Sequence, residues 1–188
     1  RQPQEQGRQT LARKLASAQR SLLMKKPAYL AAAVVAVAIA VTGFLAFSRD
    51  EAPQVGYVLL DGSRENFADL RGKVVVVNFW ATSCVTCVKE MPDLVDTYRK
   101  YRERGLDMVA VAMSYDPPAY VSNFAETRQL PFKVAIDNTG EVARQFGDVK
   151  LTPTTYVVNK RGQIVKRYVG EPDFAQLHQL IERLLSEA

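Results

Sequence analysis

The chain contains two cysteines, Cys84 and Cys87, separated by two residues. An apolar run over residues 74–77 precedes them, and residues 86–104 carry apolar side chains at three- and four-residue spacing, which predicts a strand followed by an amphipathic helix. Cys84 is then expected at the helix N-terminus, where unpaired backbone N–H groups and the helix dipole favour a thiolate. The pattern therefore indicates a dithiol that can take part in disulfide exchange.

The same two cysteines could instead bind zinc or form an inert disulfide. A structural zinc site needs about four ligands, and the single histidine, His178, lies far along the chain in a C-terminal amphipathic segment. A disulfide between Cys84 and Cys87 closes too small a loop to constrain the unfolded chain strongly. We therefore expect no metal site and no cofactor beyond a redox-active Cys84–Cys87 disulfide.

Residues 78–92 resemble the active-site segment of the thioredoxin superfamily, and most closely that of its membrane-anchored TlpA/ResA-like branch. The segment reads Asn-Phe-Trp-Ala-Thr-Ser-Cys-Val-Thr-Cys-Val-Lys-Glu-Met-Pro. Its last residue, Pro92, matches the proline that kinks the first active-site helix of the family. A second motif, Leu151–Thr154, matches the loop that holds the family's cis-proline, here Pro153, opposite the dithiol. The resemblance covers residues 52–188 and implies a protein-disulfide oxidoreductase.

Two other functions compete with disulfide exchange. In peroxiredoxins the reactive cysteine lies in a Pro-x-x-x-Thr-x-x-Cys motif. In this chain Val77 and Ala81 stand at the proline and threonine positions, so a peroxidase is disfavoured. A Cu(I) chaperone module could use both sulfurs as soft ligands. Met91 is the one methionine near them in sequence, and it is expected in the core. Copper binding therefore stays the alternative function.

Disulfide exchange needs an attacking thiolate and a second thiol that resolves the mixed disulfide. We expect Cys84 to attack and the more buried Cys87 to resolve. The resolving thiol must lose a proton, which a carboxylate can accept. Thioredoxins carry an aspartate at the position of Asn78, so this role passes to Glu90, three residues after Cys87. TlpA/ResA-like proteins have a glutamate at that place; a solvated Glu90 that acts on the helix dipole alone is the alternative.

Three further residues are candidates for contact with a substrate. Trp80 is expected to pack beside the dithiol and shape the docking surface, with an ordinary core position as the alternative. A cis peptide bond at Pro153 would, by the resemblance, leave the backbone N–H and C=O of Thr152 facing the cysteines. An extended substrate segment could pair with that backbone while its own cysteine meets Cys84.

The hydrophobic pattern also predicts the elements that position these residues. Strands are expected over residues 57–60, 74–77, 106–113, 132–136, 154–159 and 163–169. Helices are expected over residues 86–104, 117–129, 139–146 and 174–185. This order predicts an α/β fold over residues 57–188, a thioredoxin-like α/β/α sandwich with a central mixed sheet.

Charge is concentrated at the start of the chain. Residues 1–27 contain seven basic side chains and one acid, so they carry +6 and the remainder carries −1 of the net +5. A domain that binds nucleic acid would need the basic surface on its folded part. We therefore expect no nucleic-acid partner.

Residues 28–47 contain no charged side chain. Twenty helical residues span a hydrocarbon core of about 30 Å, so this stretch predicts a transmembrane signal-anchor helix, followed by a linker over residues 48–56. The alternative is a cleaved signal peptide, but its apolar region is normally about 7–15 residues long after a short basic lead.

The positive charges before this span place the N-terminal tail, residues 1–27, in the cytoplasm. The expected location is therefore the inner membrane, as a single-pass protein with its catalytic domain in the periplasm, where dithiols can be held oxidised. The resemblance further implies the partners. They would be apocytochrome c or a copper-site protein as the disulfide substrate, in cytochrome c biogenesis or copper-site assembly, and a DsbD/CcdA-like membrane protein as the electron donor.

Overall fold

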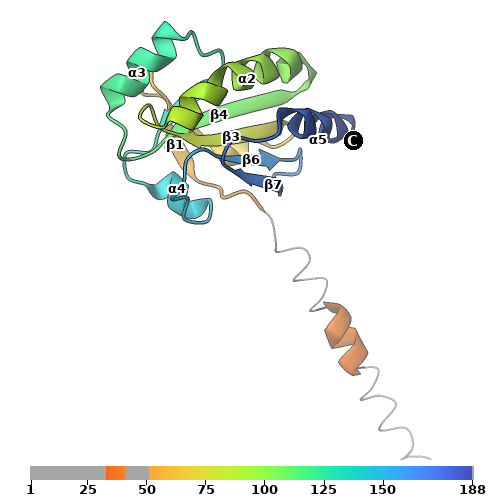
Figure 1. Ribbon diagram of the computed structural model, residues 1–188. Helices are drawn as coiled ribbons and strands as arrows, with labels where there is room; N and C mark the ends of the chain where they lie inside the picture. The colour runs from red at the N-terminus through yellow and green to blue at the C-terminus, as the bar shows by residue number, and fades with distance from the viewer. Residues whose placement is uncertain (1–32, 41–50, 188) are drawn as a thin grey trace, which may run out of the picture. The chain divides into compact units, whose positions relative to one another are not determined.

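The computed structural model describes residues 33–40 and 51–187. The chain divides into two units, residues 1–49 and residues 50–188. The second unit is built around a five-stranded sheet in the order β5-β4-β3-β6-β7 (Figure 1). Its strands are β3 (Val74–Trp80), β4 (Leu106–Ala112), β5 (Lys133–Ile136), β6 (Thr154–Val158) and β7 (Ile164–Val169).

The strands of this sheet run in both directions. β3, β4 and β5 are parallel, whereas β6 is antiparallel to β3 and β7 is antiparallel to β6. β3 is the central strand and is buried on both faces, which explains its unbroken apolar run. The polar exception in β3 is Asn78, which is fully buried. A buried amide in a central strand has to find hydrogen-bond partners inside the protein.

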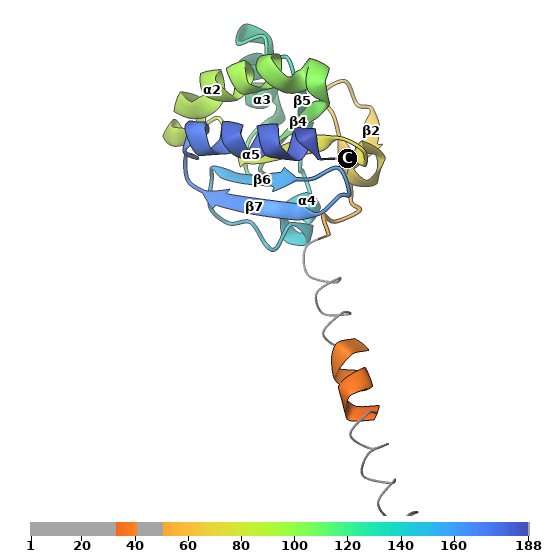
Figure 2. The ribbon, with the colours of Figure 1, turned by 90° about the vertical axis from the view of Figure 1, so that its right-hand side faces the viewer.

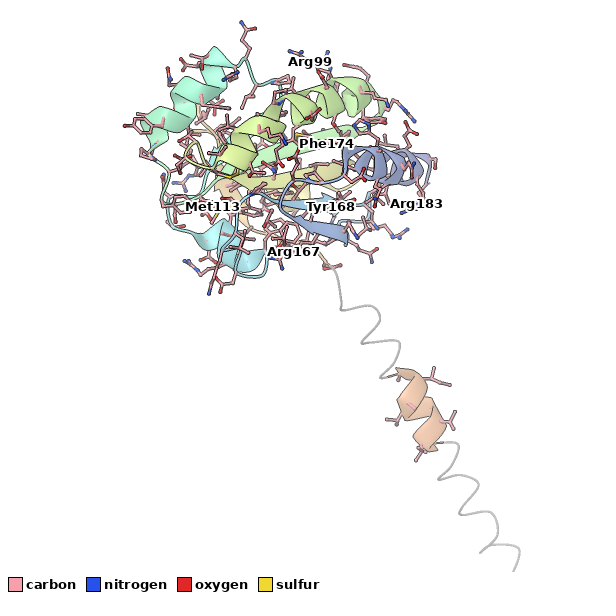
Figure 3. The ribbon with its side chains drawn as sticks, viewed as in Figure 1. Arg99, Met113, Arg167, Tyr168, Phe174 and Arg183 are labelled. Carbon is pink, nitrogen blue, oxygen red and sulfur yellow. A yellow bond between two sulfur atoms is a disulfide. The ribbon has the colours of Figure 1, made fainter. Side chains whose placement is uncertain are left out.

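Helices cover both faces of the sheet. One face carries α2 (Val85–Tyr101), α3 (Pro118–Thr127) and α5 (Phe174–Ser186), and the other carries α4 (Glu141–Gln145) and the 3₁₀ turn η1 (Phe67–Leu70). Figure 2 shows α2 and α5 side by side over the sheet. Tyr168 of β7 and Phe174 of α5, labelled in Figure 3, pack against the core on that face. The predicted α/β sandwich with a central mixed sheet is confirmed.

Helix α2 begins directly after Cys84, contains Pro92, and ends as an α-helix at Tyr101. A 3₁₀ turn, η2 (Arg102–Arg104), continues it. Gly105 then stops the helix with φ of 102°, a left-handed conformation that glycine adopts without a Cβ clash. The predicted helix over residues 86–104 is thus present, with its last turn tightened.

A short hairpin precedes the sheet. Its strands, β1 (Gly56–Val58) and β2 (Arg64–Asn66), pair antiparallel. The strand predicted over residues 57–60 ends earlier than expected because Leu59 leaves this ladder and forms a bridge with Ala135 of β5. Lys133 of β5 also forms an ion pair with Glu65 at 2.8 Å. The hairpin is therefore attached to the β5 edge of the sheet.

Part of the N-terminal unit is also described. Residues 33–40 form a helix whose side chains are exposed. Within the described part of the chain, no helix is both long and apolar enough to cross a membrane. The predicted tail over residues 1–27 and most of the predicted span over residues 28–47 lie outside the described residues. Both of them stay predictions.

Candidate active site

Cys84 and Cys87 are joined by a disulfide at the start of α2, with their Cα atoms 5.2 Å apart. Cys84 is the N-cap of the helix, and its Sγ accepts a hydrogen bond of 3.2 Å from the backbone N–H of Cys87. Its side chain is partly exposed, whereas Cys87 is fully buried. Because the helix N-terminus favours negative charge on sulfur, the reduced site would hold its reachable thiolate on Cys84.

This difference in access predicts different alkylation rates in the reduced protein. At neutral pH, Cys84 should react with iodoacetamide roughly tenfold faster than Cys87 or more, because the thiolate is the reacting species and the helix start favours it at the exposed sulfur. The measurement is timed alkylation followed by mass spectrometry of the peptide that holds both cysteines. Equal rates would show that burial of Cys87 does not protect it.

Glu90 lies on the buried face of α2, three residues after Cys87, and is 0% exposed. One carboxyl oxygen, Oε1, accepts a hydrogen bond of 3.0 Å from Nδ2 of Asn78. The pKa of Glu90 is raised to about 7, mainly by burial; the Asn78 hydrogen bond opposes this rise, and the nearby acids Glu171 and Asp93 add to it. Glu90 is therefore not the solvated helix-start charge of the alternative interpretation. It is an interior carboxyl that can take up a proton near neutral pH.

Asn78 connects Glu90 to the sheet. The same Nδ2 atom donates a second hydrogen bond, also of 3.0 Å, to Oγ1 of Thr155. Asn78 and Thr155 are register partners on β3 and β6. The sequence predicts for Asn78 only that it cannot accept a proton, and it does not mark Thr155 as a site residue. The two residues are 77 positions apart, so their hydrogen bond cannot be predicted from local sequence spacing.

The loop before β6 carries the predicted cis-proline. The Thr152-Pro153 peptide bond is cis, which confirms that prediction. Pro153 is buried, and its C=O accepts a hydrogen bond of 2.8 Å from the N–H of Gly170. Thr152 is partly exposed, and its hydroxyl lies 3.3 Å from the hydroxyl of Tyr115. Thr152 can therefore be reached from solvent, and its role toward a substrate stays a proposal.

The structure corrects the expectation for Trp80. Its side chain is 0% exposed and packs against Phe124 of α3, with 5.1 Å between the ring centroids. Trp80 ends the central strand and points into the core on the α2 face, so a substrate cannot touch it in this conformation. The core position, which was the alternative, is the correct one.

Sequence reasoning missed a buried carboxylate that fixes the turn before Cys84. Asp116, in the loop between β4 and α3, is 3% exposed. It accepts hydrogen bonds from the backbone N–H and the hydroxyl of Thr82, both of 2.6 Å. Each of these bonds spans 34 residues, so the spacing along the sequence gives no signal of it. Asp116 therefore holds the two loops together beside the disulfide.

Within the described residues, no group of three or more histidine, cysteine or acidic side chains is placed to hold a metal ion. His178 lies on α5, where its Nε2 is 2.8 Å from the hydroxyl of Thr97 on α2. Its ring thus serves the packing of α5 on α2. A soft metal would find two sulfurs here, and they are bonded to each other in this structure.

The comparisons with known proteins agree with this geometry. The model of the Redoxin family matches residues 48–181. The chain is 35% identical over 134 residues to the thiol-disulfide oxidoreductase ResA of Bacillus thuringiensis subsp. konkukian, covering 71% of this chain and 76% of that one. It is 32% identical over 164 residues to ResA of Halalkalibacterium halodurans, covering 83% and 92%. A thiol:disulfide interchange protein of the thioredoxin family from Chlorobium tepidum superimposes with a TM-score of 0.67 at 29% identity, covering 74% of this chain and 99% of that chain.

Proposed function

The chain belongs to the Redoxin family and is a ResA-like thiol-disulfide oxidoreductase, and we propose that it acts as a membrane-anchored reductase of protein disulfides outside the cytoplasm. One observation carries the proposed chemistry: a partly exposed Cys84, a buried Cys87 and a buried Glu90 follow one another along the first turns of α2. An accessible nucleophile, a protected resolving thiol and a proton acceptor are the groups that disulfide reduction requires.

The reaction begins with the reduced enzyme. The thiolate of Cys84 attacks one sulfur of a substrate disulfide, forms a mixed disulfide and releases the other substrate sulfur as a thiolate. Cys87 then gives its proton to Glu90, and its thiolate attacks the sulfur of Cys84, which releases the second substrate thiolate. The substrate has gained an electron pair, and the enzyme ends with the Cys84–Cys87 disulfide found in this structure.

The proposed substrate surface surrounds Cys84. Three exposed apolar side chains lie at the start of α2 and in two loops of the site: Val85 of α2 is 83% exposed, and Leu151 and Tyr115 in the loops are 66% and 57% exposed. Tyr115 contacts Thr152 through their hydroxyl groups, which supports Thr152 as part of the same surface. Exposed apolar side chains of this kind favour an unfolded or extended polypeptide as the substrate. The resemblance to TlpA/ResA-like proteins supports apocytochrome c or a copper-site protein, with a DsbD/CcdA-like donor returning electrons.

The proposed anchor rests on the sequence. Residues 28–47 are uncharged, and the 27 residues before them carry +6. A span of that length with positive charge on one side favours a single-pass helix with a cytoplasmic N-terminus. We therefore place the catalytic domain in the periplasm.

Topology can be measured with accessibility tags. In spheroplasts, a tag placed before residue 25 should be shielded from added protease, whereas a tag after residue 188 should be cleaved. The opposite pattern would overturn the periplasmic location. Release of the tagged domain into the soluble fraction would instead support a cleaved signal peptide.

The function itself is tested by two equilibrium measurements on the purified protein. Titration against a glutathione couple should show one two-electron transition that is lost when either cysteine is replaced. A Cu(I) competition assay on the reduced protein tests the alternative function, because two thiolates are soft ligands of the kind that Cu(I) prefers. Tight Cu(I) binding without reversible dithiol oxidation would favour the chaperone alternative.

A further inference from the structure

The interior next to the disulfide holds buried polar atoms that lack a hydrogen-bond partner. In the described part of the chain, the buried side-chain atoms of this kind are Oδ1 of Asn78, Nε1 of Trp80 and Oε2 of Glu90. Asn78 and Trp80 are two residues apart on β3, so they face the same side of the sheet, the side covered by α2 and Glu90. Leaving such an atom without a partner inside the protein costs free energy, because its hydrogen bonds to water are lost on folding. Their gathering at one place therefore needs an explanation.

The contacts of Asn78 fix its amide group from two elements. Nδ2 has two hydrogens, and each has an acceptor at 3.0 Å: Oε1 of Glu90 on α2 and Oγ1 of Thr155 on β6. The other amide atom, Oδ1, has no partner, and neither does the second oxygen of the carboxyl to which Nδ2 is bonded. The two unpartnered oxygens thus belong to two groups already joined by one hydrogen bond.

The protonation state of Glu90 decides whether these oxygens can satisfy each other. An ionised carboxylate only accepts, as does the amide oxygen, so with a charged Glu90 the two stay unpaired. A proton on Oε2 of Glu90 makes that atom a hydrogen-bond donor. Oδ1 of Asn78, on the amide that already binds the other carboxyl oxygen, can then accept from it. A neutral Glu90 and Asn78 can then bond at two points, as a carboxylic acid and a primary amide do. When Glu90 is charged, the remaining hydrogen bond, from Nδ2 of Asn78 to Oε1 of Glu90, is charge-assisted and therefore stronger.

Building on the proposed role of Glu90 as proton acceptor, we propose that Asn78 is a positioning residue that allows the buried Glu90 to exist in both protonation states. When Glu90 is ionised, Nδ2 of Asn78 supplies the hydrogen bond that partly replaces lost solvation. After Glu90 takes the proton of Cys87, Oδ1 of Asn78 accepts that proton in a second hydrogen bond. Without the amide, burial would hold Glu90 neutral, and a neutral carboxyl cannot receive the proton of Cys87.

Other ionisable groups also act on Glu90. Asp93 on α2 and Glu171 in the loop before α5 both raise its pKa. Glu171 forms an ion pair of 3.0 Å with Lys89, which offsets part of its charge. The thiol of Cys87 lies one helical turn away, and β6 contributes the uncharged hydroxyl of Thr155. A substitution at Asn78 leaves all of these groups in place, so a change in the titration of Glu90 would report on the amide itself.

The experiment uses Asn78→Leu, whose side chain has the same branching and the same number of heavy atoms but no polar atom, in the wild-type and Glu90→Gln backgrounds. Val76→Ala is the matched control, since Val76 is equally buried on the same face of β3 and makes no polar contact through its side chain. Carbon-13 NMR of the Glu90 carboxyl gives its titration in the oxidised protein. Stopped-flow reaction of the reduced protein with dithiobis(nitrobenzoate) separates two steps: the first coloured thiolate reports attack by Cys84, and the second reports resolution by Cys87.

We expect Glu90 to bind its proton at least about tenfold more tightly in the Asn78→Leu variant than in the wild type. At neutral pH it should slow the second release of thiolate roughly tenfold and change the first by no more than about twofold. In the Glu90→Gln background, the same substitution should change the second release by no more than about twofold, because the group on which Asn78 acts is then absent. Val76→Ala should lower stability without changing the titration of Glu90.

An unchanged titration of Glu90 in folded Asn78→Leu, or an equal slowing in both backgrounds, would overturn the inference and leave Asn78 with a structural role. Should Asn78→Leu fail to fold, Thr155→Val removes the acceptor that orients the amide, and it should tighten proton binding to Glu90 in the same direction by a smaller factor. No shift in that variant would count equally against Asn78. If Glu90→Gln alone leaves the second release unchanged, the proton-acceptor role fails, while the titration still decides the role of Asn78.

Discussion

Replacing Cys84 with serine should reduce disulfide reductase activity by roughly a thousandfold or more, because a serine hydroxyl is not ionised near neutral pH and the thiolate is the attacking species. Replacing Cys87 with serine should have a different result. Cys84 is partly exposed and keeps the helix N-terminus around it, so attack should continue. With no thiol to resolve it, the mixed disulfide should accumulate.

Both variants can be measured with one protein-disulfide substrate, by following thiol release and the fraction of enzyme linked to substrate. Ser83→Ala is a suitable control, because Ser83 is exposed beside Cys84 and carries no sulfur. Expression of Cys87→Ser in the native membrane would also identify the physiological substrate by the mass of the linked partner. Trapping by the Cys84 variant, with none by the Cys87 variant, would show that the two cysteines have opposite roles.

The oxidised Glu90→Gln variant should be more stable than the wild type in alkaline solution, by about 3 kcal/mol. The sign follows from the pKa of Glu90, which burial raises from 4.5 to about 7 in the folded protein. Between these two pH values the folded protein keeps a proton on Glu90 that the unfolded chain has released. The stability of the wild type therefore falls as pH rises through this window, and it stays lower above it. Glutamine carries no charge and removes that loss.

Denaturant unfolding of the oxidised proteins at about pH 4.5 and pH 8.5 would measure this effect. The two proteins should have similar free energies of unfolding in acid, and in alkali the wild type should unfold at a lower denaturant concentration than Glu90→Gln. The control is Glu126→Gln on α3, since Glu126 is an exposed glutamate of the same size. Parallel stability curves for wild type and Glu90→Gln would mean that Glu90 reaches solvent when it ionises.

The sequence alone determined the chemistry of the site. The patterns that predicted it are local: the spacing of Cys84 and Cys87, the apolar run before them and the helical period after them. Each follows from the repeat of a strand or a helix, which depends only on residues that are close in sequence. For the same reason, the order of strands and helices predicted an α/β sandwich. The cis bond before Pro153 was likewise expected, from the resemblance of a short motif.

The tertiary structure decided the surroundings of these residues. Burial of Glu90, its hydrogen bond to Asn78, and the link from Asn78 to Thr155 arise where α2 lies across β3 and β6. The same holds for Trp80, whose burial depends on α3. Asp116 reaches Thr82 only because β3 and β4 are neighbours in the sheet. A residue's type and local period state what chemistry it can perform; its solvation and partners depend on segments far away in the sequence, and these set the pKa and access that the reaction uses.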